Sequence, residues 1–155
     1  MSSSKPGSSR TDALALAVRY TRARVRSAHE VLAYLHRRGI PPRTARRAVE
    51  SAQALGAVDD RACARLWAGQ WARQGYAAAA IRQKLLTKGL EARVADAAVA
   101  MLDAAEEDRR RAQLLIDARL RRGQAPRGRL ARWLAARGFD ADIIEQTLAN
   151  SHEEQ

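Results

Sequence analysis

The sequence has a single cysteine, Cys63, so no internal disulfide can form. No apolar run among the 155 residues approaches the roughly 18 residues that a membrane-spanning helix needs. The N-terminus also lacks a basic segment followed by an apolar stretch and a small-residue cleavage site. These absences argue against a disulfide-stapled secreted scaffold and against a membrane protein. We expect a cytoplasmic protein with no membrane partner.

Aromatic residues are scarce, at 5% of the chain, and β-branched residues are few. Alanine, leucine, arginine and glutamate dominate instead, and these residue types favour helices over strands. With 46% apolar residues, the chain can still bury a core. The composition therefore predicts an all-α protein.

Acidic residues are outnumbered, with 17 Asp and Glu against 28 Lys and Arg, which gives a formal net charge of +11. Residues 1–52 hold 11 basic and 3 acidic side chains, whereas residues 103–155 hold 10 of each. Such an excess predicts attraction to a polyanion or to an acidic protein surface, with a solvated face that has no partner as the alternative. The candidate binding residues are Arg22, Arg24, Arg26, Arg37, Arg38, Arg43, Arg46 and Arg47.

A Leu-x-x-x-Gly pattern followed by an apolar residue occurs at residues 35–39, 85–89 and 134–138. Its glycines lie 50 and 49 residues apart, and apolar residues recur in phase with them. Three helices fit each period, and so small a unit must pack on a neighbour to bury its core. We predict three tandem three-helix repeats of about 50 residues in an elongated, curved molecule. The predicted parts are a disordered Ser-rich tail over 1–10, repeats over 11–56, 57–102 and 103–150, and a C-terminal tail over 151–155.

Local patterns mark where the helices begin and end. Ser27 and Glu30 have the spacing of a capping box at a helix N-terminus. Gly39 stands where a left-handed residue ends that helix, and Pro41-Pro42 prevents its continuation and suits the start of the next helix. Asp140 is expected to cap the last helix. The apolar faces expected to be buried include Leu55, Leu66, Trp67, Trp71 and Met101.

The sequence offers little for catalysis or metal binding. The three histidines, His29, His36 and His152, lack the i,i+4 spacing of a metal-binding helix, and one cysteine cannot build a zinc cluster. No catalytic residue, metal or cofactor is therefore expected. Asp59 and Asp60 are adjacent, and we interpret them as helix caps, with an acid–base pair as the alternative.

A helical stripe carries Cys63, Trp67 and Trp71. A free thiol on such a stripe behaves as a small hydrophobic group, and aromatic residues at helical spacing usually belong to a core. We therefore expect the two tryptophans to be buried. The alternative is a platform for stacking nucleic-acid bases, which requires them to face outward beside basic residues.

Short motifs follow one another in a fixed order along the chain. They are Arg24-Val25-Arg26-Ser27 with Glu30-Val31, the Leu35 to Gly39 turn, Val58-Asp59-Asp60, Gly75-Tyr76, Lys88-Gly89 and Arg137-Gly138-Phe139 with Ile143-Ile144. In this order and phase they resemble the bacterial regulatory protein RecX family over roughly residues 12–149. One departure is Cys63, where the family usually has an aromatic residue.

The resemblance implies three tandem three-helix repeats and a non-enzymatic regulator that binds the RecA recombinase on single-stranded DNA. Such a protein lodges in the filament groove and restrains strand exchange and ATP hydrolysis, which places it in DNA repair, homologous recombination and the SOS response. Inhibition is the expected effect, with stabilisation or disassembly of the filament as alternatives. The implied partners are the RecA filament and single- or double-stranded DNA, and we expect the chain to be a monomer.

The alternative is a helical-repeat protein that binds DNA or RNA without RecA, because three-helix units with a basic third helix also resemble helix-turn-helix readers. Binding to bare DNA that falls steeply with salt and is unaffected by RecA would favour it. An enzyme has the least support, since the sequence offers no convergent polar cluster.

Overall fold

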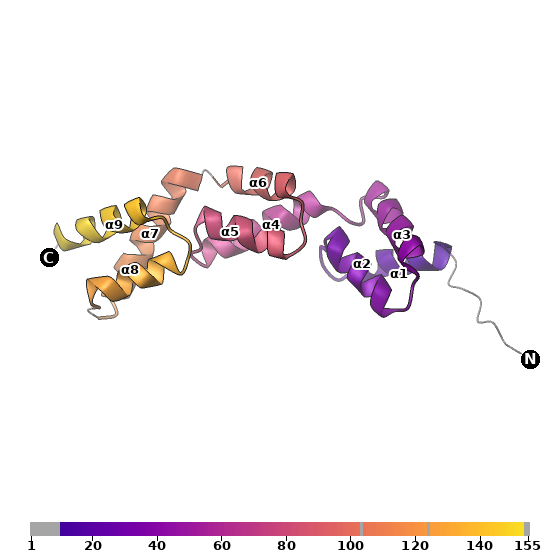
Figure 1. Ribbon diagram of the computed structural model, residues 1–155, viewed down its shortest axis with the longest axis horizontal. Coiled ribbons are helices and arrows are strands. Elements are labelled where there is room, and N and C mark those ends of the chain that lie inside the picture. The colour runs from indigo at the N-terminus through magenta and orange to yellow at the C-terminus, as the bar shows by residue number, and fades with distance from the viewer. Residues whose placement is uncertain (1–9, 103, 124, 154–155) are drawn as a thin grey trace, which may run out of the picture. The chain divides into compact units, whose positions relative to one another are not determined.

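The computed structural model describes residues 10–102, 104–123 and 125–153, and every regular element in these ranges is an α-helix (Figure 1). The predicted all-α fold is therefore confirmed. The described chain divides into unit 1, which ends at Cys63, and unit 2, which begins at Ala64. The helices are α1 Arg10–Thr21, α2 Ala28–Arg37, α3 Pro42–Ala54, α4 Asp60–Arg73, α5 Ala78–Thr87, α6 Ala92–Ala100, α7 Ala104–Leu120, α8 Arg127–Ala135 and α9 Ala141–Glu153.

The two predicted tails are only partly described. Residues 1–9 of the Ser-rich segment lie outside the described residues, and Arg10, its predicted last residue, already begins α1. At the other end, α9 continues to Glu153 instead of stopping at residue 150.

In unit 1, α1 and α3 pack against each other and α2 packs on both (Figure 1). Ala13 and Ala17 of α1 are fully buried, and such small side chains let neighbouring helices approach closely. Val31 and Leu35 of α2 are fully buried in the same cluster. The core of unit 1 thus combines small residues on α1 and α3 with larger ones on α2.

The helix boundaries in unit 1 follow the predicted local patterns. Ser27 Oγ accepts from the Glu30 backbone N–H at 3.2 Å, and a Glu30 carboxylate oxygen accepts from the Ser27 N–H at 3.1 Å, which completes the capping box. Gly39 has a φ of +77°, so a left-handed residue does end α2. Pro41 is the N-cap of α3 and Pro42 its first residue. These three predictions are confirmed.

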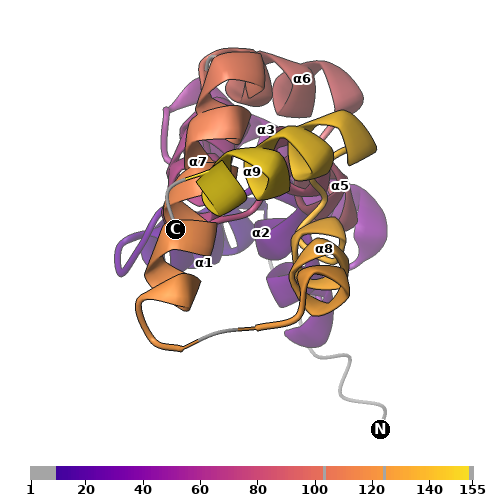
Figure 2. The same cartoon turned by 90° about the vertical axis from the view of Figure 1, so that its left-hand side faces the viewer.

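In unit 2, α9 packs against both α7 and α8, and the views in Figures 1 and 2 agree on this arrangement. The core there includes Ile116 of α7, Leu134 of α8 and Ile144 of α9. Asp140 Oδ1 accepts from the Ile143 N–H at 2.8 Å, which confirms Asp140 as the cap of α9. This three-helix group is joined to α5, because the Ala77 N–H donates to the Arg137 carbonyl at 3.0 Å.

Two carboxylates accept hydrogen bonds from the N-terminal backbone N–H groups of helices that lie far from them in sequence. Asp60 Oδ1, at the start of α4, accepts from the N–H of Ala28 in the first turn of α2 at 2.7 Å. Asp108 of α7 accepts from the N–H of Ala78 in the first turn of α5, with both oxygens at 3.1 Å. The two pairs are 32 and 30 residues apart, so the same contact recurs one repeat later. Each satisfies an amide that a helix leaves unpaired.

Three residues expected in the core are exposed instead. Leu55 and Met101 are 68% and 69% exposed, because each is the C-cap of its helix, where the chain leaves the helical path. Leu66 is 51% exposed, since the buried face of α4 runs through Cys63, Ala64, Trp67 and Ala68. The prediction that all three belong to buried faces was therefore wrong.

Candidate functional site

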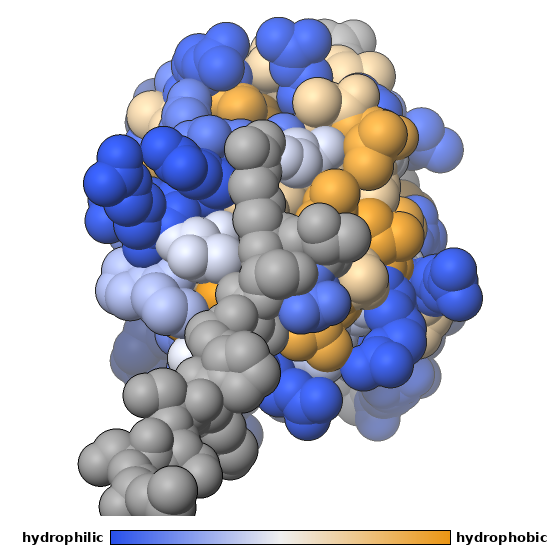
Figure 3. Space-filling view, turned by 90° about the vertical axis from the view of Figure 1, so that its right-hand side faces the viewer, coloured by the Kyte–Doolittle hydropathy of each residue, from blue (hydrophilic) through white to orange (hydrophobic). Residues whose placement is uncertain are grey.

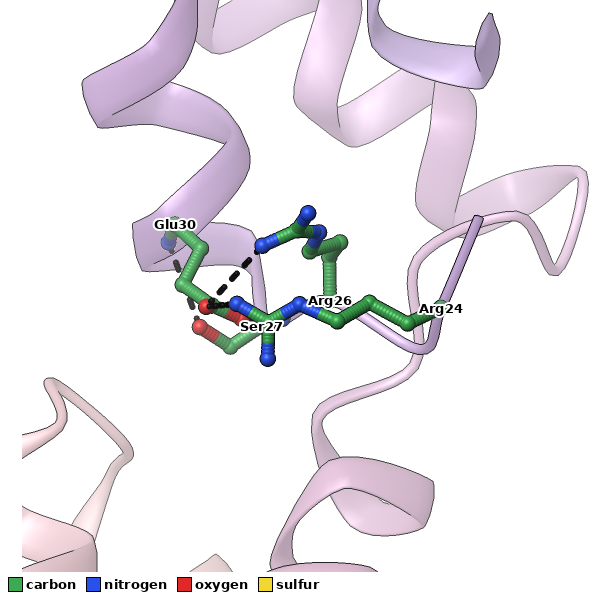
Figure 4. Close-up of polar contacts among 4 residues, drawn as sticks. All are labelled: Arg24, Arg26, Ser27 and Glu30. Carbon is green, nitrogen blue, oxygen red and sulfur yellow. Dashed lines mark hydrogen bonds and ion pairs between the residues drawn. The ribbon is translucent and has the colours of Figure 1, made fainter. Parts of the chain in front are cut away.

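The arginines predicted to bind a partner begin in the loop between α1 and α2, where Glu30 draws two of them inward. Arg24 Nη2 donates to Glu30 Oε1 at 2.8 Å, and Arg26 Nη1 lies 3.6 Å from the same oxygen (Figure 4). The other Glu30 oxygen holds the backbone of Ser27. One carboxylate thus fixes both arginine side chains and the start of α2.

Arg26 is the more enclosed of the two. Its side chain is 15% exposed, compared with 53% for Arg24, and its guanidinium lies 4.2 Å from the centroid of the Tyr20 ring. The Tyr20 ring stacks on Tyr34 at 4.0 Å, and Arg38 lies 5.8 Å from the centroid of the Tyr34 ring. Arg26 therefore serves the packing of unit 1, whereas Arg24 keeps half of its side chain in solvent.

The second group of predicted arginines lies at the other end of α2. Arg37 and Arg38 end that helix, and Arg43, Arg46 and Arg47 follow on the exposed side of α3. The last three take part in no ion pair among the described residues. The helix α2 has 10 residues and is therefore about 15 Å long; it begins after the loop holding Arg22, Arg24 and Arg26 and ends at Arg37.

The eight predicted arginines therefore form two groups. On the face of the molecule shown in Figure 3, strongly hydrophilic side chains also gather on two flanks, with apolar side chains between them. A polyanion whose charges repeat over such a distance can meet both groups, whereas a small anion can meet only one. The geometry suits an extended partner.

Unit 2 contains a cavity that the sequence did not predict. Its volume is about 540 Å³, within the range of about 300–1,000 Å³ usual for ligand sites. The described residues that line it include no carboxylate. They are Trp71, Tyr76, Ala80, Gln83, Lys84, Thr87, Lys88 and Ala136.

Cations lie over the aromatic rings at this cavity. Lys84 Nζ is 4.3 Å from the centroid of the Tyr76 ring and 5.5 Å from that of Trp71. Lys88 Nζ is 5.6 Å from the ring centroid of Trp67, a buried residue whose ring centroid lies 6.3 Å from that of Trp71. These distances are within the range of cation–π attraction. The cavity thus combines aromatic surface with two ammonium groups.

Arg137 braces the aromatic residues from the α8 side. Its guanidinium lies 5.4 Å from the ring centroid of Tyr76 and 4.9 Å from that of Trp133, and Nη1 donates to the Gln74 carbonyl at 2.9 Å. Arg119 lies 5.6 Å from the same Trp133 ring. Tyr76 is therefore in contact with Arg137, which a hydrogen bond fixes, and with Lys84, which makes no hydrogen bond among the described residues.

Trp71 departs from the expected burial, although Trp67 does not. Trp67 is 7% exposed and belongs to the core, whereas Trp71, one helical turn later, is half-buried and lines the cavity beside Lys84. The prediction of burial is wrong for Trp71. The i,i+4 spacing of the two tryptophans, matched by the i,i+4 spacing of Lys84 and Lys88, is the signal that could have located this site.

The remaining candidates behave as plain structural groups. Burial, followed by the negative charges of Asp60, Glu30 and Asp59, raises the pKa of the Cys63 thiol to about 12, so the thiol stays protonated and unreactive near neutral pH. Asp59 Oδ1 accepts from the Ala62 N–H at 3.0 Å, which confirms it as a helix cap. No group of three or more His, Cys, Asp or Glu side chains in the described ranges is placed to hold a metal ion.

The family model for the second three-helix domain of RecX matches residues 59–99. Regulatory protein RecX from Mycobacterium ulcerans (strain Agy99) is 34% identical over 149 residues, which cover 92% of this chain and 85% of that protein. The chain belongs to the RecX family. Regulatory protein RecX from Streptomyces coelicolor is 29% identical over 152 residues, covering 92% of this chain and 79% of its own length. The resemblance seen in the sequence motifs is thereby confirmed.

Solved RecX structures share the fold of this chain. RecX from Lactobacillus salivarius superposes with a TM-score of 0.78 at 16% identity, covering 91% of this chain and 95% of that one. A second regulatory protein RecX gives a TM-score of 0.74 at 21% identity, covering 89% and 72%. The helical-repeat fold is therefore that of RecX proteins. Within the described residues, no helix is both long and apolar enough to cross a membrane.

Proposed function

We propose that this chain is a non-enzymatic cytoplasmic regulator that binds the RecA recombinase on single-stranded DNA and inhibits its ATP hydrolysis and strand exchange. Membership of the RecX family, at 34% identity over 92% of the chain, is the observation that carries this proposal. Its role then lies in DNA repair, homologous recombination and the SOS response.

The charge distribution supports an extended, negatively charged partner. Residues 1–52 carry 11 basic and 3 acidic side chains. Arg43, Arg46 and Arg47 are exposed on α3, and no ion pair within the described part of the chain occupies them. A filament of DNA and protein offers phosphates and acidic side chains at repeated spacings, so both arginine groups of unit 1 can engage it.

The rate of ATP hydrolysis by the cognate RecA on single-stranded DNA tests the proposal. We expect inhibition when this chain is present at well below the concentration of RecA, because each bound molecule would restrain neighbouring protomers. A folded protein that leaves the rate unchanged at equimolar concentration would refute the proposal.

Charge reversal identifies the surface. The variant with Arg43→Glu, Arg46→Glu and Arg47→Glu should lose inhibition while keeping its helical circular dichroism, because these side chains are exposed and unpaired by described groups. The matched control changes three exposed arginines of unit 2 by the same charge, through Arg121→Glu, Arg122→Glu and Arg129→Glu. Equal loss in both variants would mean that net charge, and not the α3 surface, governs binding.

A second candidate function is nucleic-acid binding that does not involve RecA. The cavity with aromatic and lysine side chains in unit 2 favours it, because such walls suit stacked bases. Affinity for bare DNA that RecA leaves unchanged, together with an unchanged ATPase rate, would select this candidate.

A further inference from the structure

We propose that the cavity between α4 and α5 in unit 2 binds an unpaired base of single-stranded nucleic acid. In this arrangement the base stacks on Trp71, beside Tyr76, while Lys84 and Lys88 contact the adjoining phosphates. The proposal deepens the nucleic-acid part of the proposed function and rests on that part alone. It places a base-contacting site in unit 2, away from the arginines predicted from the charge distribution.

Aromatic surface at the cavity wall is the first argument. Trp71 and Tyr76 are half-buried, so each ring is anchored in the fold and still reaches the cavity. A fixed ring with an accessible edge or face is what base stacking requires. The volume of about 540 Å³ accommodates a group the size of a nucleotide.

Charge complementarity is the second argument. The sequence has three lysines, and the two that lie in described residues, Lys84 and Lys88, both line this cavity. Lys84 lies in the last turn of α5 and Lys88 is its C-cap, four residues later, and the described lining offers no carboxylate to neutralise them. An ammonium on a flexible stem can leave an aromatic ring and follow a phosphate, whereas an arginine fixed by hydrogen bonds cannot.

The position of Arg137 is the third argument, because it explains how Tyr76 keeps its orientation when Lys84 moves. The Arg137 guanidinium is held over Tyr76 and Trp133 and by its hydrogen bond to the Gln74 carbonyl. Arg137 lies in the turn after α8, and its contacts do not depend on Lys84. A strand bound at the cavity would therefore displace Lys84 from the Tyr76 ring and leave Arg137 in place.

The test compares strands that carry the same phosphates with and without bases, in the absence of RecA. Binding of the full chain to oligothymidylate and to an abasic strand of equal length is measured by fluorescence anisotropy of labelled strands. We expect oligothymidylate to bind about tenfold more tightly, the effect of one stacked base. Oligouridylate in a third arm separates DNA from RNA as the source, and a base-dependent gain with either strand supports the site. Equal affinity for strands with and without bases would overturn it.

Substitutions at the cavity show which residues produce the base-dependent gain in affinity. Trp71→Leu should remove most of it and Trp71→Phe should retain it, since phenylalanine keeps a ring at the same place. Lys84→Gln should weaken binding to both kinds of strand and lower the salt dependence by about one phosphate contact. Arg121→Gln removes the same charge from an exposed residue at the end of α7 and is the matched control.

Two results would contradict the assignment. A folded Trp71→Leu variant that keeps the full base-dependent gain would show that the base lies elsewhere. Unchanged strand binding in Trp71→Leu and Lys84→Gln, combined with lost inhibition of RecA, would mean that an acidic protein segment occupies the cavity. Because the strand assay contains no RecA, its failure leaves the proposed inhibition of the filament standing. If Trp71→Leu does not fold, the comparison of Lys84→Gln with Arg121→Gln still decides whether the strand contacts this cavity, and equal binding by the two variants would overturn the site.

Discussion

Gly138 offers the sharpest test of how the turn after α8 packs against α5. Its φ is +87°, and a Cβ added there would lie 2.5 Å from Ala80 Cβ and 3.1 Å from the Ala80 backbone nitrogen. Gly39, at the equivalent point of the first Leu-x-x-x-Gly pattern, has a φ of +77° and nothing within 4 Å of an added Cβ. The two alanine substitutions therefore share the backbone strain and differ in the clash.

The difference between them can be estimated. A left-handed alanine costs about 1–2 kcal/mol at either position, and alanine restricts the unfolded chain equally at both. Both effects therefore largely cancel when the two variants are compared. The clash at Ala80 cannot be relieved by turning a side chain, because the atoms concerned belong to the first turn of α5. Overpacking of this kind costs about 1–3 kcal/mol. Gly138→Ala should thus destabilise by about 1–3 kcal/mol more than Gly39→Ala.

Urea unfolding measures both substitutions. Far-UV circular dichroism follows the helices of both units, and tryptophan fluorescence follows unit 2 alone, because Trp67, Trp71 and Trp133 all lie there. Gly138→Ala should lower the fluorescence midpoint, and Gly39→Ala should leave that midpoint almost unchanged. If the two variants lose equal amounts of unfolding free energy, the turn after α8 does not approach α5 as closely as the structure places it.

Four further substitutions test other contacts. Since the folded pKa of Cys63, about 12, lies above its ordinary value of 9.0, only the unfolded state releases the thiol proton between these values. The free energy of unfolding should fall by up to about 1.4 kcal/mol per pH unit above pH 9, and Cys63→Ala should abolish that component in urea titrations. Asp108→Ala should lower the free energy of unfolding by about 2–4 kcal/mol, because it leaves the Ala78 N–H and the enclosed Arg111 unpaired. Asp96→Ala removes the partner of Arg82 in an exposed ion pair and should lower it by less than about 1 kcal/mol. Ser27→Ala should cost about 1 kcal/mol of unfolding free energy through loss of the α2 cap, and no measurable cost would contradict that role.

Much of the fold could be predicted from the sequence because its determinants are local. The capping box of Ser27 and Glu30, the cap at Asp140 and the turn at Gly39 each involve residues at most a few positions apart. Apolar periodicity likewise marks each helix without reference to the others. The exposed residues Leu55 and Met101 show the limit, since periodicity cannot say at which residue a helical face ends.

Contacts between distant residues could not be predicted in this way. The bond from the Ala28 N–H to Asp60 joins residues 32 positions apart, and its sequence signature is only an acidic pair that suits an ordinary cap. One of the two acids does cap α4, so the local interpretation accounts for Asp59 and misses Asp60. The cavity in unit 2 was missed for the same reason, because its walls come from separate helices whose facing sides depend on packing.

Net charge was a poor guide to which cations can meet a partner. Arg26 lies in the most basic part of the chain, yet it is enclosed by Glu30 and Tyr20. Lys84 lies in a less basic part, and its contacts with the half-buried rings of Trp71 and Tyr76 are worth about 0.5–2 kcal/mol, whereas a stacked base contributes about 1–3 kcal/mol. A base can therefore displace the lysine, which gains a phosphate in exchange. A cation of this chain can bind a partner only if the contacts that it must give up are weak. By that criterion Lys84 is more available to a partner than Arg26.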